Sequence, residues 1–274
     1  MPATYIPAAT IDEVIVQLEA IIEECIRTRN KAGYFAALYH RVTCRVKEGI
    51  VNGEFEDNPR MEVLDVLFAN RYIAAWHEWR SGKKPTGSWQ VAFGASGSWN
   101  TILLQHLFLG INAHINLDLG IASVETMAGK TFKELRRDFY NINTVLSSMI
   151  YEVVHEINRV SPVMSLLGLH ATNYNQMLMQ FTIDIARDGA WCFAEELSEQ
   201  QGADAWDKFI VERDEKIKKL GESMLHPSGL MKITLFFVKV FEWWNPAKII
   251  HALYLDPKER EKRWFKNVQP SPAT

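Results

Sequence analysis

Cysteine is scarce in this chain of 274 residues, and its three cysteines stand far apart, at positions 25, 44 and 192. An odd number of isolated thiols forms neither a disulfide framework nor a paired metal clip of the CxxC kind. The N-terminus, MPATYIPAATIDEVIVQLEA, also lacks the basic stretch and apolar segment of a secretory signal. Both absences favour a reducing compartment, so we expect a cytoplasmic protein.

Excess charge and long apolar runs are missing too. The 30 basic and 33 acidic side chains leave a formal charge of -3, which is not the basic footprint of a nucleic-acid-binding protein. The most hydrophobic segment, 230–254, meets lysines and a glutamate before the ~20 apolar residues that a transmembrane helix needs. We therefore expect no nucleic-acid partner and no transmembrane segment. Segment 230–254 remains a core helix, a homodimer face or a peripheral membrane contact.

The chain contains no GxSxG, Walker loop, GxGxxG, HExxH, DDxxD or paired CxxC sequence. These are the short motifs of α/β serine hydrolases, P-loop NTPases, dinucleotide-binding enzymes, zinc peptidases and aspartate-rich prenyl cyclases. Their absence disfavours each of those classes, and any activity must be sought in a less familiar site.

Helical periodicity is what the sequence does show. Behind a capping Thr10, apolar residues recur at 14, 15, 18, 21 and 22, and similar patterns follow along the chain, separated by Pro162, Gly202, Pro227 and Pro246. No segment alternates with period two between hairpin turns. The prediction is an all-α, single-domain multi-helix bundle of about eight to ten helices over 1–255, followed by a charged, proline-containing C-terminal tail at 256–274.

One helix-length segment, QHLFLGINAHINLDLG at 105–120, mixes polar and strongly apolar residues. At about 100° per residue, Gln105, Asn112 and Asn116 form an amide stripe, while His114 and Asp118 lie on the opposite side. Leucine and isoleucine fill the other directions, which predicts a buried helix that begins after a capping Ser98 and ends at Gly129. Each buried polar group without a hydrogen bond costs ~1 to 3 kcal/mol, so these groups need partners or a ligand.

The H-x-x-x-D spacing lets an imidazole nitrogen and a carboxylate oxygen point at one place. That arrangement suits a divalent metal ion, with His106 as a further ligand, or a general base in which Asp118 orients His114. The alternative is a satisfied internal network in which His114 simply donates to Asp118.

Partners for this pair are expected from the third helix, over residues 60–80. Glu62, Asp65, Tyr72 and Trp76 share one face, so two acids could complete the site and two aromatic rings could wall it. Arg71 points the other way on the helical wheel. Equally, this face could be a solvated helix edge. In RRDFYNIN, Asp138 lies at the border between two faces and is a candidate for reaching inward.

Four stretches resemble the family catalogued as domain of unknown function 5995 over about residues 30–145: YFAALYHRVT, FEDNPRMEVLDVLFANRY, QHLFLGINAHINLDLG and RRDFYNIN. The resemblance implies a helical fold and no particular mechanism. It implies that the family's motifs include Arg60, Glu62, Asp65, Arg71, Tyr72, Asn112, His114, Asn116, Asp118, Asp138 and Asn143.

The sequence thus leads to two hypotheses. The first is an enzyme acting on a small lipophilic substrate in a pocket between the 60–80 and 98–128 helices, with a divalent metal ion as its candidate cofactor. Its candidate residues are His114, Asp118, Glu62 and Asp65 for catalysis, Asn112, Asn116, Tyr72, Trp76, Arg71 and Asp138 for binding substrate, and His114, Asp118 and His106 for the metal. The second is a non-catalytic small-molecule or lipid-binding protein, or a structural module.

Overall fold

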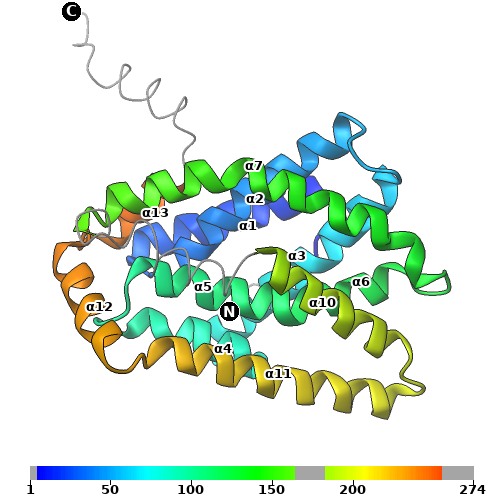
Figure 1. Cartoon of the computed structure of the whole chain (residues 1–274). Coiled ribbons are helices and arrows are strands. Elements are labelled where there is room, and N and C mark those ends of the chain that lie inside the picture. The colour runs from blue at the N-terminus through cyan, green and yellow to red at the C-terminus, as the bar shows by residue number, and fades with distance from the viewer. Residues whose placement is uncertain (1–4, 164–182, 255–274) are drawn as a thin grey trace, which may run out of the picture.

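The computed structural model describes residues 5–163 and 183–254, and within these ranges it contains helices and no strand. The all-α prediction is confirmed (Figure 1). The predicted tail at 256–274 lies outside the described residues. The α-helices are α1 (Ile11–Thr28), α2 (Gly33–Val51), α3 (Asn58–Arg80), α4 (Gly87–Gly94), α5 (Leu103–Ala113), α6 (Gly120–Thr126), α7 (Arg136–Val160), α10 (Ile183–Ser198), α11 (Ala203–Leu225), α12 (Leu230–Phe241) and α13 (Pro246–Tyr254). Short 3-10 turns occur at η1 (Ala95–Gly97) and η3 (Phe132–Leu135), and a π-helix at η2 (His114–Leu119).

Side-chain caps stand at the starts of α1 and α3. The Thr10 hydroxyl accepts a hydrogen bond from the Glu13 backbone N–H at 3.2 Å, which satisfies a free donor at the start of α1. At α3, the Asp57 carboxylate does the same for the Arg60 N–H at 3.0 Å, with a proline in the first turn. Local sequence therefore sets these helix starts.

The helices surround one central rod, which we define as residues 103–126 and which comprises α5, η2 and α6 without a break (Figure 1). Helices α2 and α3 pack on one part of its surface, and α4, α10 and α11 pack on others. The rod begins at Leu103, not at Ser98, because the Glu242 carboxylate accepts from the Leu103 N–H at 2.8 Å. It ends at Thr126, and Gly129 lies in the following turn with a φ of +76°.

The rod is the one helix in the described part of the chain that is long and apolar enough to cross a membrane, with 24 residues and a mean hydropathy of 1.3. Its most apolar window is 83% buried inside the protein. The rod's hydrophobicity is thus matched by its place in the core, with neighbouring helices on all sides.

Close packing of the rod depends on Gly110. A Cβ atom at this position would lie 2.4 Å from two ring carbons of Phe35 on α2. We expect Gly110→Ala to lower the free energy of unfolding in urea by about 1 to 3 kcal/mol, because helix and ring must separate. Gly94→Ala is the matched control, since a Cβ there meets nothing within 4 Å. Equal stability of both variants would contradict this packing.

Candidate functional site

The central rod changes its helical geometry at the predicted polar pair. Residues His114–Leu119 form a π-helix, in which backbone hydrogen bonds span one residue more than in an α-helix. Such segments inside α-helices are frequent at functional sites. Both His114 and Asp118 are buried, at 2% and 1% exposure. The segment thus places a histidine and an acid inside the core.

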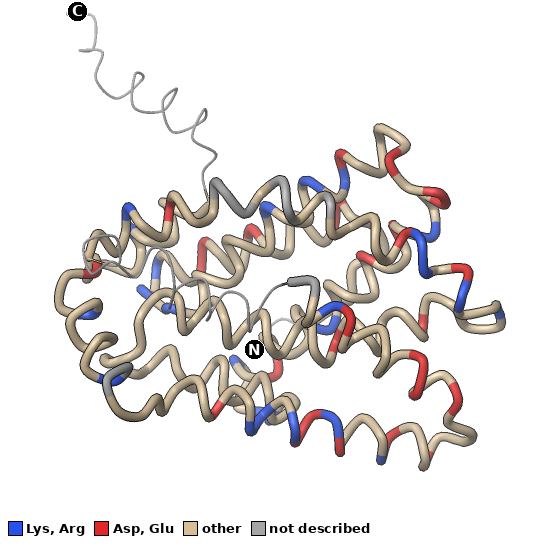
Figure 2. The backbone as a smooth tube through the Cα atoms, in the orientation of Figure 1, with Lys and Arg blue, Asp and Glu red and all other residues tan. Residues whose placement is uncertain are grey.

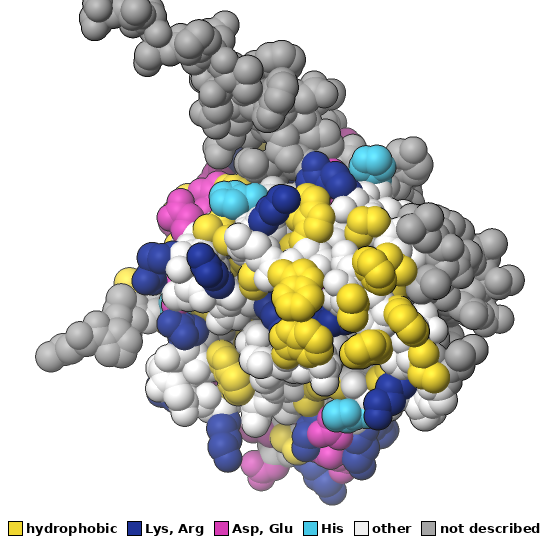
Figure 3. All heavy atoms as spheres, turned by 90° about the vertical axis from the view of Figure 1, so that its left-hand side faces the viewer, with side chains coloured by type: hydrophobic (Ala, Val, Ile, Leu, Met, Phe, Trp, Pro, Cys, Tyr) yellow, Lys and Arg dark blue, Asp and Glu magenta, His cyan; other side chains and the backbone are white. Residues whose placement is uncertain are grey.

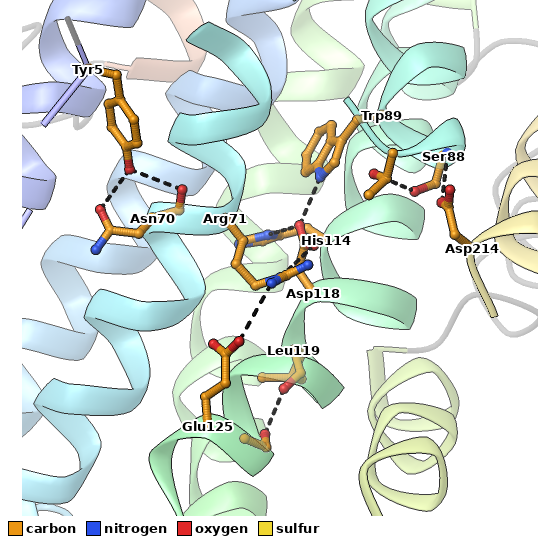
Figure 4. A network of polar contacts seen from close by, with 12 residues as sticks. Tyr5, Asn70, Arg71, Ser88, Trp89, His114, Asp118, Leu119, Glu125 and Asp214 are labelled. Atoms are coloured by element: carbon orange, nitrogen blue, oxygen red, sulfur yellow. Dashed lines mark hydrogen bonds and ion pairs between the residues drawn. The ribbon is translucent and has the colours of Figure 1, made fainter. Parts of the chain in front are cut away.

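Asp118 joins three elements through its carboxylate (Figure 4). Its Oδ1 accepts from Arg71 Nε of α3 at 3.0 Å, and its Oδ2 accepts from Trp89 Nε1 of α4 at 2.8 Å. Arg71 Nη1 also lies 3.9 Å from Glu125 Oε1 on α6. Arg71, which the helical wheel places off the face of Glu62 and Asp65, thus reaches Asp118, because η2 and α6 both pack against α3.

The imidazole of His114 is enclosed by aromatic rings. It stacks on Phe68 with ring centroids 3.5 Å apart, and the Tyr39 ring meets it edge-on at 4.4 Å. His114 Nδ1 is 3.5 Å from Asp118 Oδ2, too long for a strong hydrogen bond, and neither ring nitrogen has a hydrogen-bond partner among the described residues. Burial lowers the pKa of His114, although Asp118 opposes the shift. The ring is therefore neutral at neutral pH, with one donor and one acceptor nitrogen.

Further aromatic side chains extend this enclosure. The Tyr72 ring centroid lies 6.1 Å from that of His114 and 5.1 Å from that of Trp89. Its hydroxyl is buried without a hydrogen-bond partner in the described structure, and burial raises its pKa. Trp76 lies further from His114, and its ring packs on the Phe93 ring with centroids 5.7 Å apart. We call the inner group the His114 cluster, which comprises Tyr39, Phe68, Arg71, Tyr72, Trp89, His114 and Asp118.

The two predicted acids of α3 stand at the edge of this cluster. Asp65 is 7% exposed, and its Oδ2 has no hydrogen-bond partner within the described chain. Burial, followed by the charge of Glu62, raises the pKa of Asp65 to about 7. Burial, followed by the charge of Asp65, raises the pKa of Tyr39, whose ring contacts that of His114. Asp65 is therefore linked to His114 through Tyr39, whereas Glu62 is half-buried next to Asp65.

The predicted three-ligand metal site is not assembled. In the two described ranges, no three His, Cys, Asp or Glu side chains are grouped as metal ligands. His106 packs edge-on against Tyr34 at 5.5 Å, and burial with the charge of Lys31 lowers its pKa to about 3. It lies two helical turns from His114, beyond the reach of a shared ion, and both oxygens of Asp118 already accept hydrogen bonds.

The amide stripe serves a different interface. Asn112 Nδ2 donates to the Ile217 carbonyl at 2.9 Å, and Gln105 Nε2 donates to the Met224 carbonyl at 2.8 Å, both on α11. Asn116 Nδ2 donates to Asn112 Oδ1 at 3.1 Å. The separation of the stripe from His114 and Asp118 is confirmed. The Asn112 amide is bonded to α11 and the Asn116 amide to Asn112, so a role of these residues in binding substrate beside His114 stays a prediction.

Asp138 also lies outside the His114 cluster. Its fully buried carboxylate accepts from the Glu56 and Asp57 backbone N–H groups at 2.6 and 3.0 Å, and from Arg60 Nη2 at 2.6 Å. It does reach inward, but it anchors the start of α3. An open cleft of about 780 Å³ lies beside this anchor, lined by Asp57, Arg60, Arg137, Tyr140 and their neighbours.

In a comparison with protein families, residues 11–227 of the chain match one family. The chain belongs to the family of unknown function DUF5995. The match is wider than the resemblance at about 30–145 predicts. It covers α1 to α11, and so the whole His114 cluster of this DUF5995 protein, but neither α12 nor α13. No curated protein and no solved structure matches the chain.

Three members of the cluster escaped the sequence reasoning. Tyr39 and Phe68 read as ordinary apolar positions of helices, and Trp89 as part of a short apolar segment. The one available signal was their place within or beside the motifs YFAALYH and VLFANRY. Their convergence on His114 depends on how α2, α3 and α4 pack around the rod.

Proposed function

We propose that this protein binds a small, largely apolar molecule in the His114 cluster, between α3 and the central rod. One observation carries the proposal: both ring nitrogens of His114 and the hydroxyl of Tyr72 are buried among aromatic rings without hydrogen-bond partners in the described structure, and Asp65 Oδ2 is likewise unpaired at the edge of the cluster. Each such group costs about 1 to 3 kcal/mol. A ligand that meets them would offset this cost.

The chemistry of the cluster defines the ligand. Aromatic rings favour a flat apolar body, and the neutral His114 can donate one hydrogen bond and accept another. Arg71 is the access point, because its side chain is 25% exposed while that of Asp118 is 2% exposed. Phe68 is half-buried and covers one face of His114. We infer that the ligand enters beside Arg71 and displaces the Phe68 ring.

Metal-free catalysis is the second candidate. A neutral histidine beside a carboxylate is the composition of a general base with its orienting acid, and the 3.5 Å separation of His114 and Asp118 would need to shorten on binding. A metal-dependent reaction is less well supported, because Asp118 is already occupied by Arg71 and Trp89.

The variant His114→Phe tests the proposal. We expect it to raise the free energy of unfolding by about 1 to 3 kcal/mol, because a phenyl ring fills the same space with no unpaired nitrogen. At the same time it should abolish binding of naphthol, a flat apolar probe with one hydroxyl group. The measurements are urea unfolding and equilibrium dialysis with the probe.

His106→Phe is the matched control, since His106 is also buried and its Nε2 has no hydrogen-bond partner in the described chain, yet it lies outside the cluster. It should retain naphthol binding. If neither the native protein nor His106→Phe binds the probe, or if His114→Phe binds it as well as they do, the proposed site is wrong.

A further inference from the structure

A second feature of the protein lies at the end of the bundle, on α12. Five positions of this helix, 233, 236, 237, 240 and 241, follow the spacing of a single helical face, and all five carry large apolar side chains that are exposed. Trp244 and Trp99 extend this surface and touch each other edge-on at 5.9 Å. We call it the α12 patch, which comprises Trp99, Ile233, Phe236, Phe237, Val240, Phe241 and Trp244.

The α12 patch is unlike the rest of the described surface. Its seven side chains are 38% to 68% exposed, and every exposed phenylalanine and tryptophan of residues 5–163 and 183–254 belongs to it. Figure 3 shows hydrophobic side chains gathered on this end of the molecule. The opposite face of α12 is already used, because Val238 is buried in the core and Leu235 packs against that core. A helix that is apolar on both faces requires a second apolar environment.

Charge around the patch identifies that environment. Segment 230–254 contains Lys232, Lys239 and Lys248, and its one acid is Glu242. Glu242 is buried. Its carboxylate forms an ion pair with Lys239 Nζ at 3.1 Å and accepts hydrogen bonds from the Leu103 N–H and the Ser161 hydroxyl. Within segment 230–254 the exposed charges are therefore Lys232 and Lys248, in a protein whose formal charge is -3. Figure 2 shows the contrast with α11, along which both signs alternate.

We propose that the α12 patch is a docking surface for an anionic lipid bilayer. The apolar stripe would lie in the interface between headgroups and acyl chains, a depth at which tryptophan is favoured, while Lys232 and Lys248 contact the negative headgroups. A second copy of the chain fits less well, because a symmetric contact through this patch would bring the same lysines toward one another. All patch residues except Trp99 lie beyond the region matched by the family, so docking is a property of this chain in addition to the proposed binding site.

The test is co-sedimentation of the full chain with vesicles of phosphatidylcholine and with vesicles that also contain phosphatidylserine. We expect binding to the mixed vesicles that weakens in high salt. The double variant Phe236→Ser/Phe237→Ser should reduce the partition coefficient at least about tenfold, since burial of each exposed ring drives insertion. Lys232→Gln/Lys248→Gln should reduce it about fivefold for each lysine removed.

The matched control is Val51→Ser/Val211→Ser, which removes two exposed apolar side chains, 76% and 67% exposed, from other faces. This control should bind vesicles as the native protein does. Equal binding to both vesicle types, an equal loss in the control, or no vesicle binding would overturn the proposal. A self-association in sedimentation velocity that Phe236→Ser/Phe237→Ser abolishes, without vesicle binding, would assign the patch to a second copy instead.

Discussion

Replacing Asp118 by alanine is expected to lower the free energy of unfolding by about 3 to 5 kcal/mol, one of the two largest effects anticipated for this protein. The substitution leaves the Arg71 guanidinium without its nearest acceptor and the Trp89 indole N–H buried without any. It also removes the charge that opposes the fall in the pKa of His114. Urea unfolding followed by far-ultraviolet circular dichroism measures the loss.

Two further variants separate the causes. Asp118→Asn keeps the shape and one acceptor oxygen, so it should cost about half as much as alanine, since neutral hydrogen bonds are weaker than charge-assisted ones. Glu125→Gln changes the outer, half-exposed partner of Arg71 at 3.9 Å and should cost less than about 1 kcal/mol. If alanine at 118 costs no more than Glu125→Gln, the carboxylate is not the junction of α3, α4 and the rod.

The second large effect concerns Asp65 and depends on pH. Its pKa is about 7 in the folded protein and near 3.8 when exposed, because burial disfavours the charged form. Between these values the folded state holds a proton that the unfolded state has lost, so stability falls as pH rises through this window. Asp65→Asn, which cannot ionise, should therefore gain about 3 kcal/mol relative to the native protein between about pH 5 and about pH 8.

The buried histidines act in the opposite direction. The pKa values of His114 and His106 are lowered on folding, so their contribution to stability is complete above the unfolded pKa of about 6.5 and is lost as pH falls below it. Both proteins contain these histidines. The difference between Asp65→Asn and the native protein therefore isolates the aspartate, provided that both are unfolded in urea at each pH.

A constant difference across this pH range would contradict the raised pKa of Asp65. Glu62→Gln is the companion variant, because its charge is the second cause of the shift. It should reduce the pH dependence of stability without removing it. An unchanged pH dependence in Glu62→Gln would leave burial as the whole cause.

Both predictions concern a cluster whose groups are costly to bury. An Asp118 carboxylate with strong partners lies beside a histidine, an aspartate and a tyrosine that have unpaired atoms in the described chain. Sites that bind or react commonly retain such groups at the expense of stability. The expected gain in stability of His114→Phe and of Asp65→Asn at high pH has this same origin.

The sequence by itself determined the fold class and the elements. Apolar residues at helical spacing, Thr10 and Asp57 as caps and proline or glycine between segments are local signals, and local signals decide where most helices begin and end. The near-absence of a polar face on 105–120 was enough to predict a buried helix. The amide stripe and the His114–Asp118 pair were separated correctly for the same reason, since angular position follows from helical geometry.

The tertiary structure alone decided which groups meet. Helical angles placed Arg71 off the face that carries Glu62 and Asp65, yet η2 packs against α3 and brings Asp118 to Arg71. The start of the rod at Leu103 depends on Glu242, a residue 139 positions further along the chain. Phe68, Tyr39 and Trp89 converge on His114 from three different helices. Such contacts depend on how whole helices pack, and helix packing is set by side-chain shape over many turns, which no short motif records.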